Sequence, residues 1–255
     1  MKILAIGDII GSPGRTYLKD NLESIKKEFN IDFVIANGEN SSGGLGMNPK
    51  AFNELIIAGV NAITLGNHTW RKKDILKVID DSRVIRPINY LEGTAGRGFR
   101  FFSFNDKKIL IINAVGRIYM DPVNNPFLAV RNAVNELSSK ADIIIVDFHA
   151  EATSEKKAMG YLLDGKVNLV YGTHTHVQTA DDVVLPKGTA YITDIGMTGP
   201  KESVIGADKS IVISSFLTEI PEKRPVASGD VQFNGIVIEI DDFTNKTISI
   251  TRIIR

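Results

Sequence analysis

Residues 2–15, Lys-Ile-Leu-Ala-Ile-Gly-Asp-Ile-Ile-Gly-Ser-Pro-Gly-Arg, show the pattern from which the fold class follows. The first apolar run, residues 2–6, has the composition of a short strand and ends at Gly7-Asp8. Ser12-Pro13 then predicts the start of a helix, with serine as its cap and proline at the first helical position. This stretch therefore predicts a strand with an aspartate at its carboxyl end, followed at once by a helix.

The same alternation continues to residue 65. The first helix carries one apolar stripe at helical spacing, made by Leu18, Leu22, Ile25 and Phe29. Residues 32–36 form a second predicted strand, Asn48-Pro49 caps a second helix, and residues 61–65 form a third strand. Strands that alternate with helices predict an α/β layer architecture with parallel strands.

The rest of the chain is richer in strands. We predict strands at residues 100–104, 108–113, 142–148, 167–171, 190–193, 211–217, 235–240 and 247–253, helices at 127–137 and 154–163, and loops at 196–206 and 221–229. Asn105-Asp106 predicts a hairpin between the first two of these strands. No repeat or linker divides the sequence, so we expect one domain over residues 1–255.

The bulk composition excludes several classes of function. Thirty basic and 30 acidic residues give a formal net charge of zero. The chain therefore lacks the basic excess that would indicate binding to duplex nucleic acid. The chain has no cysteine, which excludes disulfides, thiolate metal sites and cysteine nucleophiles. The short apolar start does not resemble a signal peptide, and no segment is long enough to span a membrane. We therefore expect a cytoplasmic protein.

All four histidines follow apolar runs. His68 ends Leu-Gly-Asn-His, His149 ends Val-Asp-Phe-His, and His174 and His176 stand in Val-Tyr-Gly-Thr-His-Thr-His-Val. A single histidine in such a place is more often a packed or surface residue than a ligand. If the chain stays extended after residue 173, His174 and His176 point to the same side. Since imidazole is the commonest metal ligand, the four together indicate a metal site at strand ends.

Carboxylates and amides occupy the same kind of position. Asp8, Glu39, Asn40 and Asn67 all lie just past predicted strands. Ligands of open α/β sheets bind outside the carboxyl ends of the strands. Two carboxylates, two amides and four imidazoles are too many ligands for one ion but suit two neighbouring ions. Taken one by one, these motifs are weak, and turn formation alone explains Asn37-Gly38.

The order Gly-Asp, Gly-Asn-His, lone His and His-x-His resembles the calcineurin-like metallophosphoesterases. That superfamily usually has Asp-x-His first and Gly-Asp second, whereas this chain has Ile10 and Glu39 at the corresponding places. These departures resemble the YmdB-type phosphodiesterase branch, as do residues 7–15, 37–40, 66–70 and 173–176. The resemblance implies a four-layer α/β/β/α sandwich of two mixed sheets, and two transition-metal ions, of which iron fits best, then manganese, then zinc. It also implies hydrolysis of a small phosphodiester of the 2′,3′-cyclic nucleotide type, in a homodimer or homotetramer.

The resemblance also implies a role for each site residue. Asp8 and His176 would bind the first metal, Glu39 would bridge both, and Asn67, His149 and His174 would hold the second. Asn40 would supply the first metal with the ligand that Ile10 lacks. A hydroxide shared by the metals would attack phosphorus, and His68 would protonate the leaving oxygen.

Two other functions remain open at this point. A phosphomonoesterase or nucleotidase could use the same metal centre, because the metals treat both kinds of ester alike. A regulatory protein could keep the metals and act by binding alone, although such a protein needs no proton donor at His68. The glycine-rich loop at residues 41–46 is either a flexible connection or a rim for the substrate beside Asn40.

Overall fold

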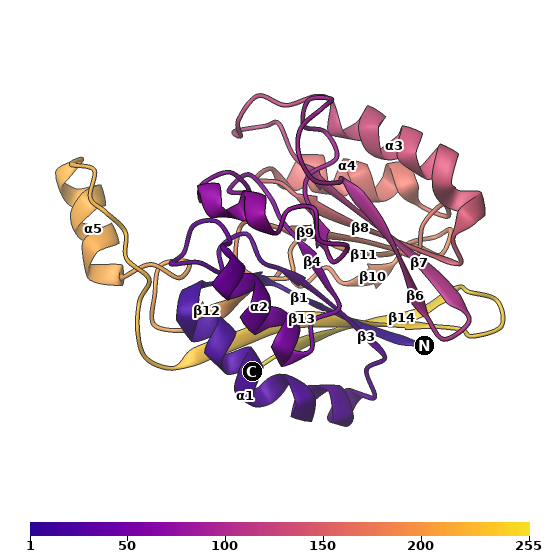
Figure 1. Cartoon of the computed structure of the whole chain (residues 1–255), viewed down its shortest axis with the longest axis horizontal. Coiled ribbons are helices and arrows are strands. Elements are labelled where there is room, and N and C mark those ends of the chain that lie inside the picture. The colour runs from indigo at the N-terminus through magenta and orange to yellow at the C-terminus, as the bar shows by residue number, and fades with distance from the viewer.

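The computed structural model describes residues 1–255 and contains two β-sheets (Figure 1). The first sheet contains β2 (Asp8–Ile9), β12 (Met197–Pro200), β13 (Val231–Ile240), β1 (Lys2–Ile6), β3 (Phe33–Asn37), β4 (Ala62–Thr64) and β5 (Val84–Ile85) in this order, with β14 (Thr247–Ile254) paired to β13. The second contains β10 (Val183–Val184), β11 (Ala190–Ile192), β9 (Leu169–Thr173), β8 (Ile143–His149), β7 (Lys107–Val115) and β6 (Phe99–Phe104). Both sheets are mixed, as expected.

Helices cover the outer face of each sheet. α1 (Gly11–Phe29) and α2 (Pro49–Ala58) lie on the first sheet, and α3 (Pro126–Leu137) and α4 (Thr153–Leu163) lie on the second (Figure 1). The short 3₁₀ helices η1 (Lys73–Lys77) and η2 (Ser138–Lys140) follow β4 and α3. The order helix, sheet, sheet, helix confirms the four-layer α/β/β/α prediction.

The alternation of side chains along each strand explains this layering. In β1, Leu4 and Ile6 join the core under α1 and α2, whereas Ile3 and Ala5 face the second sheet. The continuous apolar run of β8 divides in the same way between the sheet interface and the core under α3 and α4. Strands buried on both faces therefore appear in the sequence as unbroken apolar runs.

Parallel pairing brings the functional strand ends to one edge. β1, β3, β4 and β5 pair in parallel in the first sheet, and β7, β8, β9 and β11 pair in parallel in the second. The carboxyl ends of each set lie together, and the two sheets bring these edges face to face. Side chains from both sheets can thus meet at one place.

Three local predictions were wrong. α1 begins at Gly11, after Ile10, and Ser12 makes no capping bond, because Gly11 (φ 57°) turns the chain directly from β2 into the helix. Residues 211–217 are not a strand but part of α5 (Lys209–Thr218), whose cap Asp208 accepts hydrogen bonds from the Ser210 and Ile211 amides. The predicted loop at 196–206 contains the buried strand β12, which pairs with β2 and β13.

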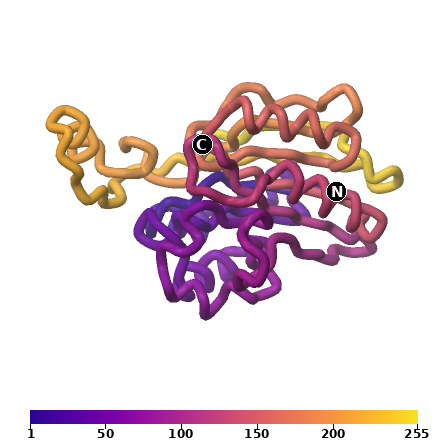
Figure 2. Tube along the Cα trace, turned by 90° about the horizontal axis from the view of Figure 1, so that it is seen from above, coloured from indigo at the N-terminus to yellow at the C-terminus, as the bar shows by residue number.

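α5 stands apart from the layers. Figures 1 and 2 show it as an arm (orange) that projects beyond the sandwich, which explains why its β-branched sequence finds no strand to pair with. Only Val212 of this helix is buried. The other expected helices and strands are present, with ends shifted by a few residues. No helix has the length and apolar character needed to cross a membrane.

Candidate metal centre

The structure brings all eight candidate side chains to the shared edge of the two sheets. Asp8 begins β2, just after β1, Glu39 and Asn40 follow β3, and Asn67 and His68 follow β4, all from the first sheet. His149 is the last residue of β8, and His174 and His176 follow β9, all from the second sheet. No element supplies more than two of them, so the cluster exists only when both sheets are assembled.

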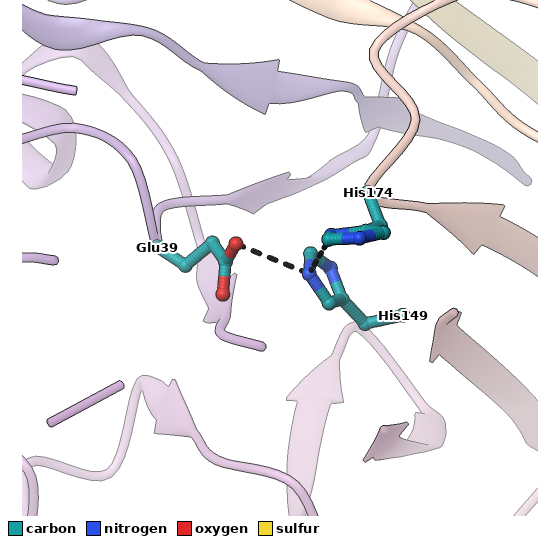
Figure 3. A group of neighbouring side chains, drawn as sticks. All are labelled: Glu39, His149 and His174. Carbon is teal, nitrogen blue, oxygen red and sulfur yellow. Dashed lines mark hydrogen bonds and ion pairs between the residues drawn. The ribbon is translucent and has the colours of Figure 1, made fainter. Parts of the chain in front are cut away.

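One half of the cluster gathers around His149 (Figure 3). The ligand atoms of Glu39, His149 and His174 lie within 4.8 Å of one another. Nε2 of His149 lies 3.1 Å from Glu39 Oε1, 2.9 Å from Asn67 Oδ1 and 3.1 Å from His174 Nδ1. We call these four residues, Glu39, Asn67, His149 and His174, the His149 half.

The other half gathers around Asp8. Nε2 of His176 lies 3.5 Å from Asp8 Oδ1, and the Asn40 amide nitrogen lies 3.2 Å from both of these atoms. The same nitrogen lies 3.3 Å from Glu39 Oε1, which links the two halves. We call Asp8, Asn40 and His176 the Asp8 half. Here Asn40 directs its nitrogen, not its oxygen, at the carboxylates, so ligation through the oxygen requires the amide to turn over.

The hydrogen bonds around His149 show that the site fits a cation. The hydroxyl of Thr173 donates to Asp147, so it can only accept from His149 Nδ1–H at 2.9 Å. His174 Nε2 lies 3.1 Å from a Glu151 oxygen, which assigns the proton of a neutral His174 to Nε2. When His149 Nε2 carries no proton, its lone pair and that of His174 Nδ1 converge with the oxygens of Glu39 and Asn67. Such a convergence repels unless a proton or a metal ion lies between the atoms. Burial disfavours charged His149, but the Glu39 and Asp8 carboxylates raise its pKa, so a proton occupies this place in the metal-free protein.

The charge balance leads to the same conclusion. Asp8 and Glu39 are fully buried, and no lysine or arginine forms an ion pair with either; their only charged partners are histidines. Burial alone would raise the pKa of Glu39, but His149 and His68 outweigh it and hold that pKa well below its usual range. Buried carboxylates without permanent cations are the expected surroundings of a metal.

The two histidines after β9 have opposite titration tendencies in the metal-free protein. Burial, and then the nearby His149, lower the pKa of His174 to about 3. Burial also disfavours charged His176, but the Asp8 carboxylate and the Ile205 carbonyl raise its pKa to about 9. His174 is therefore already neutral, as a ligand must be, whereas His176 must lose a proton to bind a metal.

The expected extended chain at His174 and His176 is not observed. Both residues have positive φ, 101° and 64°, because the chain turns immediately after β9. Thr175 fixes this turn, since its amide and hydroxyl both donate to Asp194, at 3.1 and 2.7 Å. Lys156 from α4 donates to the same carboxylate at 2.7 Å in a buried ion pair. The two imidazoles enter the same cluster through this turn and not through strand alternation.

Sequence reasoning missed the supports behind the ligands. Asp147 accepts hydrogen bonds from Thr64 and Thr173 and so connects both sheets beneath His149. Burial raises the pKa of Asp147 to about 6 despite these hydrogen bonds. The available signal was its position two residues before His149 on one strand, which places both side chains on the same face. Asp194 and Lys156 gave no comparable signal, because they come together only through packing.

His68 lies beside Glu39 and Asn40 at the surface of the cluster. The chain turns after Gly66, and the His68 amide donates to Glu39 Oε2 at 2.9 Å. Its Nδ1 lies 2.7 Å from Asn40 Oδ1 and 3.2 Å from Glu39 Oε1. A side chain at Gly66 would come within 2.4 Å of Glu39 and of the His149 ring, so the turn demands glycine.

Comparison with known proteins places this geometry in a family. A family model described as YmdB-like protein matches residues 4–253. The chain belongs to the YmdB-like family. A 2′,3′-cyclic-nucleotide 2′-phosphodiesterase of Bacillus subtilis (strain 168) is 47% identical over 255 residues, which cover 100% of this chain and 97% of that protein.

Solved structures of other proteins have the same fold as this YmdB-like chain. A structure described as a novel phosphatase from Mycoplasma pneumoniae has a TM-score of 0.94 and 41% identity, covering 100% of this chain and 93% of that one. The NAD nucleotidase of Haemophilus influenzae has a TM-score of 0.63 at 12% identity, covering 100% of this chain and 55% of that one, and it shows similarity of fold alone.

Proposed function

We propose that this chain is a metal-dependent phosphodiesterase that hydrolyses 2′,3′-cyclic nucleotides. One observation carries the proposal: eight donor and acid side chains meet at one edge in a chain that is 47% identical, over its whole length, to an enzyme named for that reaction. The lone-pair convergence at His149 supports the metal part independently of the relatives.

We assign the two metal positions to the two halves of the cluster. Asn67, His149 and His174 would hold one ion, Asp8, Asn40 and His176 would hold the other, and Glu39, which contacts both halves, would bridge them. A nitrogen and oxygen donor set suits iron, manganese and zinc alike. Our order of preference, iron, then manganese, then zinc, follows the family resemblance. When bound, the ions would neutralise the phosphate oxygens and activate water for attack.

Asn40 changes its task in this proposal. In the metal-free arrangement its amide N–H groups take the place of a cation between Asp8 and Glu39. When a metal takes that place, Asn40 would turn its oxygen inward as a ligand. His68 Nδ1 then keeps Glu39 Oε1, 3.2 Å away, as an acceptor.

His68 would act as the acid that protonates the leaving oxygen. With the Asn40 oxygen turned towards the metal, Glu39 holds the Nδ1 of His68, so Nε2 is the nitrogen left to donate a proton to the substrate. After donation, the Nδ1–H hydrogen bond remains and keeps the ring in place. A positioned general acid typically contributes about 10²–10⁴-fold for a poor leaving group such as an alkoxide.

The surroundings favour a diester over a monoester. No lysine or arginine makes a hydrogen bond or ion pair with any of the eight residues. A monoester dianion carries additional charged oxygens that usually require such partners, whereas a diester carries one negative charge. One solved relative is described as a phosphatase, so hydrolysis of a phosphomonoester is our second candidate function.

A substrate panel tests the proposal. The protein is purified without oxygen, loaded with Fe²⁺, Mn²⁺ or Zn²⁺, and assayed on adenosine 2′,3′-cyclic phosphate, a linear dinucleotide and adenosine monophosphates, with metal content measured on the same samples. We expect two ions per chain and the highest kcat/KM on the cyclic nucleotide. Preference for the monoesters would establish the alternative, and metal binding without turnover of any ester would leave only a binding function.

A further inference from the structure

An apolar hollow opens directly onto His68 and His176. Its volume is about 270 Å³, and it lies between the 41–46 loop, the segment before α5, α5 itself and the segment after it. Most of the side chains that line it are apolar: Ile10, Leu45, Val204, Ile205, Val212, Phe216 and Val226, with Arg224 at the side. The glycine-rich loop beside Asn40 thus forms part of a rim, one of the two roles considered for it.

The wall of this hollow is tied to the metal cluster. His176 Nδ1 donates to the Ile205 carbonyl at 2.8 Å, so a cluster ligand and the wall hold each other. Ala207 forms β-bridges with Val204 and Val226, which join the two segments on either side of α5. The Ile205 wall of the hollow is therefore held next to His176, and His68 lines the same hollow.

The lining indicates a flat, largely apolar ligand. Phe216 offers an aromatic ring, and the Arg224 guanidinium lies 5.8 Å from its centroid, a pair that can receive a stacked ring system. Ligand pockets usually measure about 300–1,000 Å³, so this hollow accommodates one ring system and not an oligonucleotide.

The chemistry of the leaving group selects the occupant. If His68 protonates the 2′-oxygen of a cyclic nucleotide, that oxygen lies at His68. The base is attached to the ribose carbon next to the one that carries this oxygen, so it must lie close to His68 as well. We propose that this hollow binds the nucleobase of the substrate, an inference that rests on the proposed function.

A second hollow provides the comparison. It measures about 460 Å³, lies on the other side of the Asn67-His68 turn, and includes Asn67, Trp70, Tyr90 and Asp121 but not His68. Its exposed tryptophan could also stack a base. A base in that hollow would lie next to the proposed metal ligand Asn67 and not next to the proposed proton donor. We therefore assign the nucleobase to the hollow at His68.

The proposed pocket also predicts weak discrimination among bases. Apart from Arg224, its lining carries no polar side chain outside the cluster that could read the edge of a base. Stacking tolerates any base, because every base has a flat face. We expect the four 2′,3′-cyclic nucleotides to be hydrolysed with kcat/KM values within about ten-fold of one another.

The test removes the two exposed apolar walls and compares two substrates. The double variant Leu45→Ala/Phe216→Ala is assayed on adenosine 2′,3′-cyclic phosphate and on the base-free 1-O-methylribose 2′,3′-cyclic phosphate, and adenosine 3′-monophosphate binding is titrated separately. We expect KM for the nucleotide and the dissociation constant of the product to rise about ten-fold, with the base-free ester unchanged. The matched control is Leu128→Ala/Phe243→Ala, because Leu128 is as exposed as Leu45 (47% and 46%) and neither control residue lines the hollow.

The outcomes separate this inference from the proposed function. If the wild-type protein hydrolyses neither ester, the proposed function fails. If it hydrolyses both and the double variant changes both equally or neither, the nucleobase site is overturned. Base-dependent loss in Trp70→Ala and not in the double variant would place the base in the second hollow instead.

Discussion

The two halves of the candidate metal centre differ in what holds them in place. Behind the His149 half, Thr173 and Asp147 form a buried hydrogen-bond chain that spans both sheets. The Asp8 half has its carboxylate equally buried, but its histidine is fixed by the carbonyl of Ile205, in the segment that leads to the projecting α5. Both halves contain carboxylate, amide and imidazole groups. The sandwich core supports one half, and a surface segment supports the histidine of the other.

This difference teaches that one cluster can combine a preformed site with an adaptable one. His174 is already neutral in the metal-free protein, whereas His149 beside Glu39 and His176 beside Asp8 both have raised pKa values, so each half must release one proton to bind a metal. Because the core holds the His149 half and a surface segment holds His176, we expect the His149 half to bind metal first and tightly and the Asp8 half to bind second.

Glu39→Gln should remove the connection between the halves. A neutral amide bridges two cations poorly, so we expect both metals to bind more weakly and activity to fall by at least about 100-fold. Elemental analysis and turnover of a cyclic nucleotide, measured together, check this. Glu136→Gln on the exposed side of α3 serves as the control. Full metal content and full activity would refute the bridging role.

His68→Ala should leave both halves intact while removing the acid between them and the substrate. We expect both metals to remain and kcat on a cyclic nucleotide to fall by about 10²–10⁴-fold. On a nitrophenyl phosphodiester the loss should be much smaller, because that leaving group needs no proton. The ratio of the two losses is the measurement. Equal losses would argue against an acid role, and loss of a metal would make His68 a ligand.

Thr173→Val should weaken only the His149 half. Without the hydroxyl, His149 Nδ1 loses its partner, and loss of such a support typically costs 10–100-fold in metal affinity, so we expect roughly that for one ion of two. Thr175→Val is the matched variant, since its amide still donates to Asp194, and we expect a change of a few fold at most. Calorimetric metal titrations resolve the two sites. Equal weakening in both variants would contradict the comparison.

The smallest effect concerns the Asp8 half after metal removal. The pKa of His176 is about 9 in the folded protein, above its unfolded value of 6.5. Its contribution to stability is therefore fully present below pH 6.5 and lost as pH rises through 9, and it amounts to at most about 3 kcal/mol. Denaturant unfolding of chelator-treated protein between pH 6 and 10 should show this decline, and His176→Asn should make it shallower, with the remainder from His149, whose pKa is also raised. An unchanged slope in the variant would exclude His176 as its source.

The layered fold could be predicted because local patterns and global packing agree. Nearly unbroken apolar runs, as in the strand at residues 143–149, and apolar stripes at helical spacing are both direct consequences of two covered sheets. α5 was mistaken for a strand because its β-branched sequence says nothing of whether a neighbouring strand exists. β12 was missed because its pairing partners, β2 and β13, lie far away along the chain.

The sequence by itself determined which residue types stand at the strand ends, because strand length and polarity are local properties. It contained Asp8, Glu39, Asn67 and the four histidines as an inventory. Only the tertiary structure decided how they meet: the left-handed turn that carries His174 and His176, the Asp147 support and the Lys156–Asp194 pair. These depend on contacts between residues that are distant in sequence, and such contacts form only when the two sheets pack against each other.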